Sequence, residues 1–293
     1  GQTFPDRDAM ALGSPVEVAS GLFSQNGYLN DVTPAKTGFS YGDPVGALTA
    51  VSAVLMAVRK QRRTGQGGYW DISLRDALSF GIGSAFADWS MNQVERPHRG
   101  NRHPVYAPQG VYRAFGDDEW VAISVRDDTD WLAFREALGS PEWTADPELA
   151  TAAGRHRRHD ELDARIEEWT STRCARDIEV ALQDAGVPAG AALNYRQLRR
   201  DPQVNARGMF REIVHPVFGL ETRSASIWER GQVAPPLDRP APCFGEHNRE
   251  VLIGILGMSV EAVDELERQR AVAPLDEVAD RAEASAENEQ NTV

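Results

Sequence analysis

A long helical pattern begins at Gly42-Asp43-Pro44 and is the clearest secondary-structure signal in the sequence. Aspartate is favoured at the N-cap of a helix, and proline suits the first helical position. Apolar side chains then recur at helical spacing, at Leu48, Val51, Leu55 and Val58. A basic last turn complements the helix dipole, and a glycine-rich stretch at 64–68 ends the helix. The apolar run at 45–58 is too short to cross a bilayer, so we predict a helix buried in a protein core.

The segments around this helix indicate an α/β fold. Residues 69–74, Tyr-Trp-Asp-Ile-Ser-Leu, follow the glycine turn and predict a strand. A helix, a tight turn and a strand together form half of an α/β unit. Residues 76–89 predict a further helix, and 16–23 predict a short one.

The middle of the chain predicts a small α+β domain between two linkers. Residues 92–108 have the composition of a linker, since the stretch 95–104 is polar and contains two prolines. Two alternating runs around Gly116-Asp117-Asp118 then predict a hairpin. Helical patterns follow at 130–138, 160–170 and 176–185, before a proline-rich linker at 207–242 and two closing helices at 246–256 and 259–268.

Composition excludes several classes of protein. The 293 residues carry a net charge of −13, which disfavours nucleic-acid binding because phosphate recognition needs a basic face. Six acidic residues against one basic residue at 273–293 predict an acidic, disordered tail. The two cysteines, Cys174 and Cys243, lack metal-ligand spacing and predict reduced, structural thiols. We find no signal peptide or membrane span, and we expect a cytoplasmic protein.

Several different short motifs follow one another along the chain in a definite order. They are Gly1-Gln2-Thr3 with Pro5, Ser20-Gly21-Leu22, Tyr41-Gly42-Asp43-Pro44, Arg62-Arg63-Thr64-Gly65-Gln66-Gly67 before Asp71-Ile72-Ser73-Leu74, Asn101-Arg102-His103-Pro104, Ala107-Pro108 with Gly110-Val111-Tyr112-Arg113, Asp118-Glu119-Trp120-Val121-Ala122-Ile123, Ala185-Gly186-Val187-Pro188, and Gly245-Glu246-His247-Asn248. Their order and spacing resemble the class III CoA-transferases of the CaiB/BaiF type. That family includes formyl-CoA and crotonobetainyl-CoA transferases and the related α-methylacyl-CoA racemases. The resemblance runs from residue 1 to about residue 272 and lacks the N-terminal segment of the family.

The resemblance implies a Rossmann-like large domain with a small α+β domain inserted in its sequence, and interlocked dimers. On this basis residues 1–90 belong to the large domain, 91–104 and 201–244 are linkers, and 105–200 form the small domain. The helices at 245–272 return to the large domain, and 273–293 form the tail. The CoA-binding residues are expected mostly in the missing N-terminal segment.

Asp43 is the residue to which the resemblance assigns catalysis. The family's catalytic aspartate occupies this Gly-Asp position, where it attacks an acyl-CoA carbonyl to give a mixed anhydride and then an aspartyl-CoA thioester. The alternative is that Asp43 only caps the helix, which contributes about 1 kcal/mol. With the surrounding motifs, we favour catalysis.

The other candidates are less specific. Gln109 and Gly110 match a loop that borders the active site in the family, and Gln109 could contact the acyl or anhydride oxygen; a plain turn before a strand is the alternative. His103, with Asn101, could orient this loop, or could be ordinary linker polarity. Two basic clusters are more simply explained by a solvated helix end and a helix surface than by CoA-phosphate or metal binding. They are Arg59, Lys60, Arg62 and Arg63, and Arg155, His156, Arg157, Arg158 and His159.

These observations predict an acyl-CoA:carboxylate CoA-transferase. Its partners are an acyl-CoA, a free carboxylic acid and a second copy of the chain; it needs no metal and no permanently bound cofactor. One alternative is a racemase or epimerase of the same superfamily, which requires a second acid/base group, typically a His shortly before the Asp. The corresponding stretch is Ala11-Leu12-Gly13-Ser14-Pro15, and the first histidine of the chain is His98, which argues against racemisation. Another alternative is a catalytically incomplete fragment or subunit.

Overall fold

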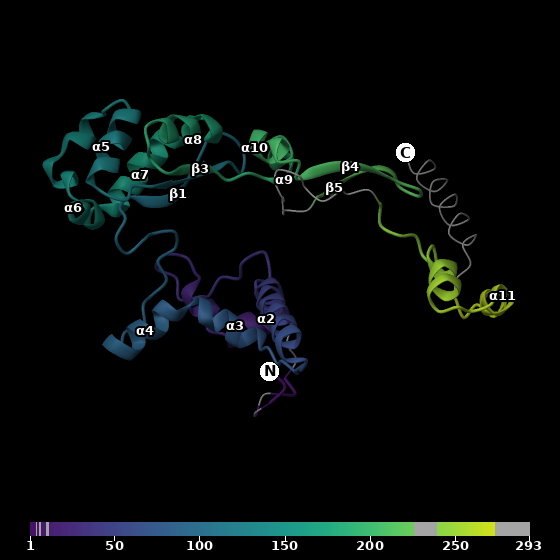
Figure 1. Cartoon of the computed structure of the whole chain (residues 1–293). Helices are drawn as coiled ribbons and strands as arrows, with labels where there is room; N and C mark the ends of the chain where they lie inside the picture. The colour runs from purple at the N-terminus through teal and green to yellow at the C-terminus, as the bar shows by residue number, and fades with distance from the viewer. Residues whose placement is uncertain (4, 6, 10–11, 226–238, 273–293) are drawn as a thin grey trace. The chain divides into compact units, whose positions relative to one another are not determined.

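A computed structural model describes residues 1–3, 5, 7–9, 12–225 and 239–272. The chain divides into two compact units, residues 1–192 and 193–293, and both helices and strands contribute to the fold (Figure 1). The acidic tail predicted at 273–293 lies outside the described residues.

The first part of the chain is helical and includes the predicted Gly42 helix, α2. Its elements are α1 (Gly13–Ala19), the 3₁₀ turn Leu22–Gln25, α2 (Gly42–Thr64), α3 (Leu74–Gly81) and α4 (Gly83–Asn92). The expected helix at 76–89 is therefore two helices, because Ile82 leaves the helical conformation with φ −105° and ψ 26°. The strand expected at 69–74 is wrong for the described chain: the segment is irregular up to Ser73, whose hydroxyl caps α3 by accepting from Asp76 N–H. A strand needs a hydrogen-bonded neighbour, and no described residue pairs with this segment.

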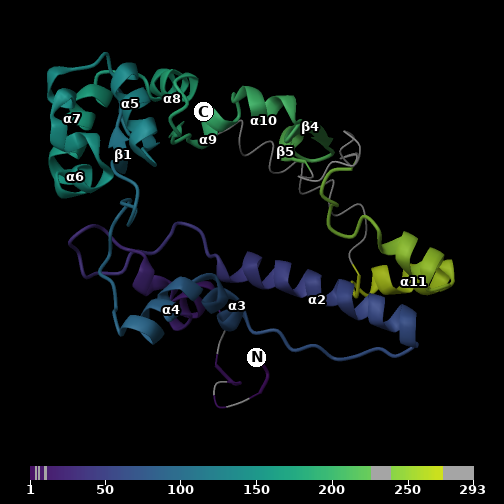
Figure 2. The ribbon, with the colours of Figure 1, turned by 60° about the vertical axis from the view of Figure 1, so that its left-hand side comes forward.

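Helix α2 differs from its prediction in its burial. It spans 23 residues and is the longest helix of the described chain (Figure 2). Leu48 and Leu55 are each 65% exposed, and Val51 is 56% exposed, so the expected burial is wrong within the described residues. By length and composition alone, α2 could also cross a membrane, a weak test that core helices of soluble proteins pass too. The apolar spacing was correctly identified, but the surface that would cover it is not among the described residues.

A three-stranded antiparallel sheet organises the small α+β region. Strands β1 (Gln109–Arg113) and β2 (Trp120–Ser124) form the predicted hairpin, and β3 (Ala189–Ala191) pairs with the other edge of β2. The helices gathered around the sheet in Figure 1 are α5 (Asp128–Ala137), α6 (Ala152–Arg157), α7 (His159–Thr170) and α8 (Ala175–Asp184), with 3₁₀ turns at Glu142–Ala145 and Pro147–Ala150. Three of these helices were predicted to within two residues at each end.

The small region owes its order to one buried apolar core. Val121, Ile123 and Val125 alternate along β2 and its extension, so their side chains point to the same face of the sheet. Trp131 and Phe134 of α5 pack against them, with ring centroids 5.9 Å apart. Helix α7 packs on β1, and α8 packs on β2 and β3. This region therefore contains the buried layer that α2 lacks.

The second unit contains short elements. They are α9 (Tyr195–Leu198), α10 (Pro202–Ala206), the antiparallel pair β4 (Phe210–His215) and β5 (Gly219–Ser224), a π-helical turn Glu250–Ile255, and α11 (Val260–Arg268). The hairpin at 210–224 corrects the irregular linker expected there. Its turn spans residues 216–218, and Gly219, which begins β5, has a φ of +70°, a conformation that favours glycine. The predicted cap of the last helix is confirmed, since Ser259 Oγ accepts from Ala262 N–H.

Candidate active site

Asp43 lies exposed in the first turn of α2. The helix begins at Gly42 with Tyr41 as its N-cap residue, so Asp43 is the second helical residue and not the N-cap that its sequence position suggested. Its side chain makes no capping hydrogen bond. Among residues 1–225 and 239–272, apart from the undescribed positions near the N-terminus, the carboxylate has no hydrogen-bond or ion-pair partner. Asp43 is thus a charged group that no described residue holds or neutralises.

Two glycines allow neighbouring helices to approach the Asp43 turn closely. A Cβ on Gly42 would lie 3.4 Å from Val16 Cγ1 of α1 and 3.6 Å from Leu78 Cδ1 of α3. A Cβ on Gly46, one turn later, would lie 1.8 Å from Leu74 Cδ2, a distance that no real contact allows. Glycine at 46 therefore lets α3 pack closely against α2, one turn after Asp43.

The first residue of α1 lies beside the carboxylate. A Cβ on Gly13 would lie 2.7 Å from Ser40 Oγ and 3.7 Å from Asp43 Oδ2. Any larger residue at 13 would displace Ser40 and crowd the carboxylate. Gly13 lies in the stretch 11–15, where a racemase of this superfamily would carry its histidine. In the structure, the residue of this stretch beside Asp43 is a glycine, which has no side chain.

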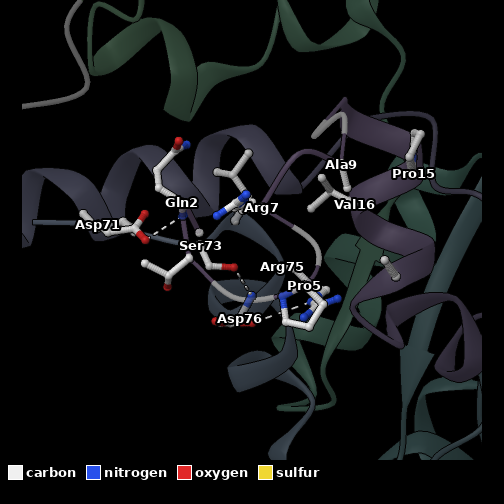
Figure 3. A pocket seen from close by; sticks show the side chains of 15 residues that line it. Gln2, Pro5, Arg7, Ala9, Pro15, Val16, Asp71, Ser73, Arg75 and Asp76 are labelled. Carbon is white, nitrogen blue, oxygen red and sulfur yellow. Dashed lines mark hydrogen bonds and ion pairs between the residues drawn. The ribbon is translucent and has the colours of Figure 1, made fainter.

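A cavity of about 540 Å³ adjoins the same helices (Figure 3). Its lining comes from the N-terminal segment, from α1 and from the start of α3, and includes Gln2, Val16, Asp71 and Asp76. Asp71 Oδ2 accepts from Gln2 N–H at 2.6 Å. Asp43 does not line this cavity, but Val16 contributes to its wall and also packs against Gly42. One buried side chain therefore separates the cavity from the Asp43 turn.

The predicted loop residues are held within the small region. Gln109 begins β1, and both ends of its amide are bonded: Nε2 donates to Asn101 O at 3.1 Å, and Oε1 accepts from Ser124 Oγ at 2.9 Å. His103 Nδ1 accepts from Val105 N–H and Tyr106 N–H, and its ring stacks on Tyr106 at 4.0 Å. His103 thus contacts the backbone at 105–106, and its role in orienting the active-site loop stays a prediction. No hydrogen bond or ion pair between described residues joins Asp43 to Gln109, Gly110 or His103, and a substrate contact for Gln109 stays a prediction.

Residues on α6 and α7 anchor the loop from the other side. Arg155 is fully buried and donates to Ala107 O, Leu149 O and the Asp128 carboxylate. His159 Nε2 accepts from Gln109 N–H at 3.2 Å. Burial lowers the pKa of His159, against the opposing effect of Asp163. Arg155 and His159 were expected to lie on a helix surface rather than to form a metal site. Both are buried instead and bond the backbone at Ala107 and Gln109.

A second group of polar side chains fixes the start of the loop. Arg102 donates to the carboxylates of Asp160 and Asp163, and Tyr112 OH donates to Asp163 Oδ1 at 2.8 Å. Burial, followed by the charge of Asp163, raises the pKa of Tyr112 well above its usual range. Tyr112 is therefore a neutral hydrogen-bond donor near pH 7. Among the described residues no cluster of His, Cys, Asp and Glu side chains has the geometry to hold a metal ion.

The basic end of α2 is solvated in the structure. Arg59, Lys60, Arg62 and Arg63 are all exposed, and none forms an ion pair with a described residue. This agrees with the interpretation of a solvated helix end. It adds no support for the alternative that these side chains bind CoA phosphates.

Comparison with known proteins decides the family. The model of CoA-transferase family III matches residues 1–248. The chain belongs to CoA-transferase family III. It is 30% identical over 273 residues to succinyl-CoA–D-citramalate CoA-transferase of Chloroflexus aurantiacus, covering 93% of this chain and 67% of that protein. It is 24% identical to formyl-CoA:oxalate CoA-transferase of Bradyrhizobium diazoefficiens, covering 92% of this chain and 68% of that enzyme.

A solved structure supports the same fold for this family III chain. A CAIB/BAIF family protein from Brucella suis superposes with a TM-score of 0.75 at 24% identity, over 87% of this chain and 65% of that one. The chain thus spans about two thirds of the length of these relatives. The resemblance drawn from the motifs is confirmed at the level of the family.

Glu17 is the residue near the site that the sequence analysis missed. It lies on α1, is fully buried, and its Oε1 accepts from Tyr41 N–H at 2.5 Å. The signal that could have found it is a carboxylate between two valines, Val16 and Val18, on a short helix that directly precedes the Ser20-Gly21-Leu22 motif.

Proposed function

We propose that the complete protein is an acyl-CoA:carboxylate CoA-transferase in which Asp43 is the nucleophile. The observation that carries the proposal is an exposed carboxylate, with no partner among the described residues, at the first turn of α2 in a chain that belongs to CoA-transferase family III. The relatives of known activity transfer CoA between carboxylic acids, by their names. A carboxylate serves as a nucleophile only if it is accessible, and exposure of Asp43 supports the proposal.

The proposed chemistry uses Asp43 in four balanced steps. A carboxylate oxygen attacks the acyl-CoA carbonyl, the C–S bond breaks, and a mixed anhydride and CoA thiolate result. The thiolate attacks the aspartyl carbonyl of the anhydride and releases the donor acid, leaving an aspartyl-CoA thioester. The acceptor carboxylate then attacks this thioester to give a new anhydride and thiolate. The thiolate finally attacks the acyl carbonyl, which forms the product acyl-CoA and regenerates Asp43.

The position of Asp43 favours this chemistry in two ways. The N-terminal end of α2 carries a partial positive charge that stabilises the ionised carboxylate without covering it. The packing of Gly42 and Gly46 against α1 and α3 fixes the backbone from which the side chain projects. Holding the nucleophile in one place removes the entropic part of the barrier, which can reach about 7–11 kcal/mol in well-oriented reactions.

The remaining features of the proposal concern the complete protein. Its substrates are an acyl-CoA and a free carboxylic acid, with CoA as part of the substrate rather than a resident cofactor. The 101–110 loop shields the anhydride from water. The Rossmann-like large domain, the interlocked homodimer and the cytoplasmic location belong to the same proposal.

Racemisation is a weaker proposal because it needs two groups that exchange protons across a carbon atom. The α1 residue beside the Asp43 carboxylate is Gly13, which has no side chain to exchange a proton.

A trapping experiment tests the proposal. The full-length protein is incubated with an acyl-CoA and then quenched with hydroxylamine, which converts an aspartyl anhydride or thioester into a hydroxamate. We expect the corresponding mass increase on the peptide that contains Asp43, in amounts that depend on the acyl-CoA. Asp43→Asn should show no adduct, and Asp76→Asn, an exposed aspartate in the first turn of α3, serves as the matched control. If Asp43→Ala retains full turnover, the proposal is wrong. If the chain binds CoA only together with a separate subunit, the alternative of a catalytically incomplete fragment is favoured.

A further inference from the structure

Glu17 is a buried carboxylate that the proposed chemistry does not use. Its exposed fraction is 0%. Oε1 accepts the Tyr41 N–H, whereas Oε2 is buried and has no hydrogen-bond partner among the described residues. Burial of a carboxylate with one unpartnered oxygen costs free energy. An apolar side chain on this face of α1 would be buried without that cost. Its presence indicates that the group does something other than fill the core.

Among the described residues, the Glu17 carboxylate forms one hydrogen bond, to the N-cap residue of the helix that carries Asp43. Tyr41 is the N-cap of α2, and its carbonyl accepts from Val45 N–H in the first turn of the helix. The N–H of Tyr41 points away from that ladder, so only a group outside the helix can fix it. Asp43 is two residues further along the same turn. A shift of the Tyr41 backbone would therefore move the Asp43 side chain.

Glu17 and Gly13 act from the same face of α1. They are four residues apart, which places them one turn apart on one side of a helix. Gly13 lies against Ser40 and near Asp43 Oδ2, and Glu17 holds Tyr41. Between them, Val16 packs against Gly42. Residues 40–43 are thus held on one side by consecutive turns of α1.

Ser20 fixes the other end of this short helix. Its hydroxyl donates to Glu17 O at 2.7 Å, and its carbonyl accepts from Ser79 Oγ of α3 at 2.9 Å. These bonds tie α1 to α3, which packs against α2 through Leu74 and Leu78. The backbone that carries Glu17 is therefore fixed relative to the backbone that carries Asp43.

We propose that Glu17 is a positioning residue for Asp43: its buried carboxylate fixes the Tyr41 N–H and thereby sets the direction in which the Asp43 side chain leaves the first turn of α2. This inference rests on the proposed role of Asp43 as the nucleophile. Misplacement of a reacting group by about 1 Å can reduce a rate on the order of 100-fold. Loss of Glu17 should therefore slow formation of the Asp43 adduct and leave the binding of acyl-CoA nearly unchanged.

The test compares two substitutions at Glu17 in the full-length protein. Glu17→Leu removes the acceptor and fits the buried, apolar face; we expect kcat and the rate of Asp43 adduct formation to fall 10- to 100-fold, with KM for acyl-CoA within about threefold of wild type. Glu17→Gln keeps a carbonyl oxygen for the Tyr41 N–H and should recover most of the rate. A purely structural role would instead lower the thermal midpoint of both variants and change KM and kcat together.

A pair of substitutions at Tyr41 tests the same hydrogen bond from the donor side. The φ of Tyr41 is −72°, which proline can adopt, so Tyr41→Pro removes the N–H with little backbone change. Tyr41→Ala also loses the ring but keeps the N–H. We expect Tyr41→Pro to resemble Glu17→Leu and Tyr41→Ala to resemble wild type.

The outcomes separate this inference from the proposed function. If wild type forms the Asp43 adduct and both Glu17→Leu and Tyr41→Pro form it at the wild-type rate, the positioning role is wrong and the nucleophile stands. If wild type forms no adduct at Asp43, the proposed function itself is wrong. Should Glu17→Leu fail to fold, the comparison of Tyr41→Pro with Tyr41→Ala still decides the inference.

Discussion

The small α+β region and the helices around Asp43 solve the same packing problem differently. At 109–191, the apolar side chains of the three strands and of α5, α7 and α8 meet in a buried core, and Val121, Ile166 and Leu182 have no exposed surface. Around α2, the contacts are made by glycines and a few side chains, and Leu48 and Leu55 remain 65% exposed. The first region is stabilised by burial within itself. The second holds a reactive group in place while leaving most of its own apolar surface uncovered by described residues.

The largest expected effect concerns chemistry in the α2 region. Asp43→Asn removes the proposed nucleophile without changing the shape of the side chain, so kcat should fall by at least about 1,000-fold. Because Asp43 is exposed and has no partner in the described part of the chain, the thermal midpoint should stay within about 2 °C of wild type. Steady-state kinetics and thermal melts of the full-length protein measure both. A large loss of stability would show that Asp43 has a structural role that its surroundings do not reveal.

The next effect contrasts buried and exposed leucines. Leu182→Ala empties part of the small core and should lower the free energy of unfolding by about 3 kcal/mol. Leu55→Ala on α2 should change it by no more than about 0.5 kcal/mol in this chain, because the side chain is already largely exposed. Urea denaturation of the two variants provides the comparison. Equal decreases in the free energy of unfolding would contradict the difference between the two regions. A larger decrease for Leu55→Ala in the full-length protein would show that a surface outside this chain covers α2.

A smaller effect on stability is expected where Arg155 holds the 101–110 loop. Arg155→Met keeps the apolar stem but leaves Ala107 O and Leu149 O without their donors, and should destabilise the small region by about 2 kcal/mol. Arg157→Met is the matched control, since Arg157 is 63% exposed and pairs only with Glu148. Its loss should be under about 0.5 kcal/mol. Hydrogen exchange of the 101–110 amides should speed up in Arg155→Met alone; unchanged exchange would mean that the loop is held by other contacts.

The smallest effect is a pH dependence of the small region. Burial lowers the pKa of His159 below its unfolded value of about 6.5, so the unfolded chain binds the extra proton first as pH falls. The corresponding stability is fully present above pH 6.5 and decreases as the pH falls through that value toward the folded pKa.

Protonation also removes the acceptor of Gln109 N–H, so β1 and the preceding loop should loosen together. Amide exchange of β1 between pH 7.5 and 5.5 measures this. His159→Gln, which keeps an acceptor but cannot titrate, should flatten the profile, and His247→Gln in the second unit should not. A wild-type profile without this acid-side decrease would contradict the assignment.

Local patterns in the sequence determined the elements of the small region, because each part of its hairpin and helices carries its own signal. Alternation in β1 and β2, and helical spacing in α5, α7 and α8, predicted these elements from the residues within each of them. The motifs also identified the family, since their order along the chain is a property of the sequence itself.

Only the tertiary structure decided how the Asp43 turn is held and what the loop residues do. Tyr41, not Asp43, is the N-cap of α2, because helix boundaries depend on backbone angles that aspartate and proline favour without fixing. The expected strand at 69–74 has no partner among the described residues, and pairing cannot be seen in one segment alone. Glu17 meets Tyr41 across 24 residues, and Gln109 meets Asn101, Ser124 and His159. Such contacts arise from the folded path of the chain, and local spacing carries no information about them.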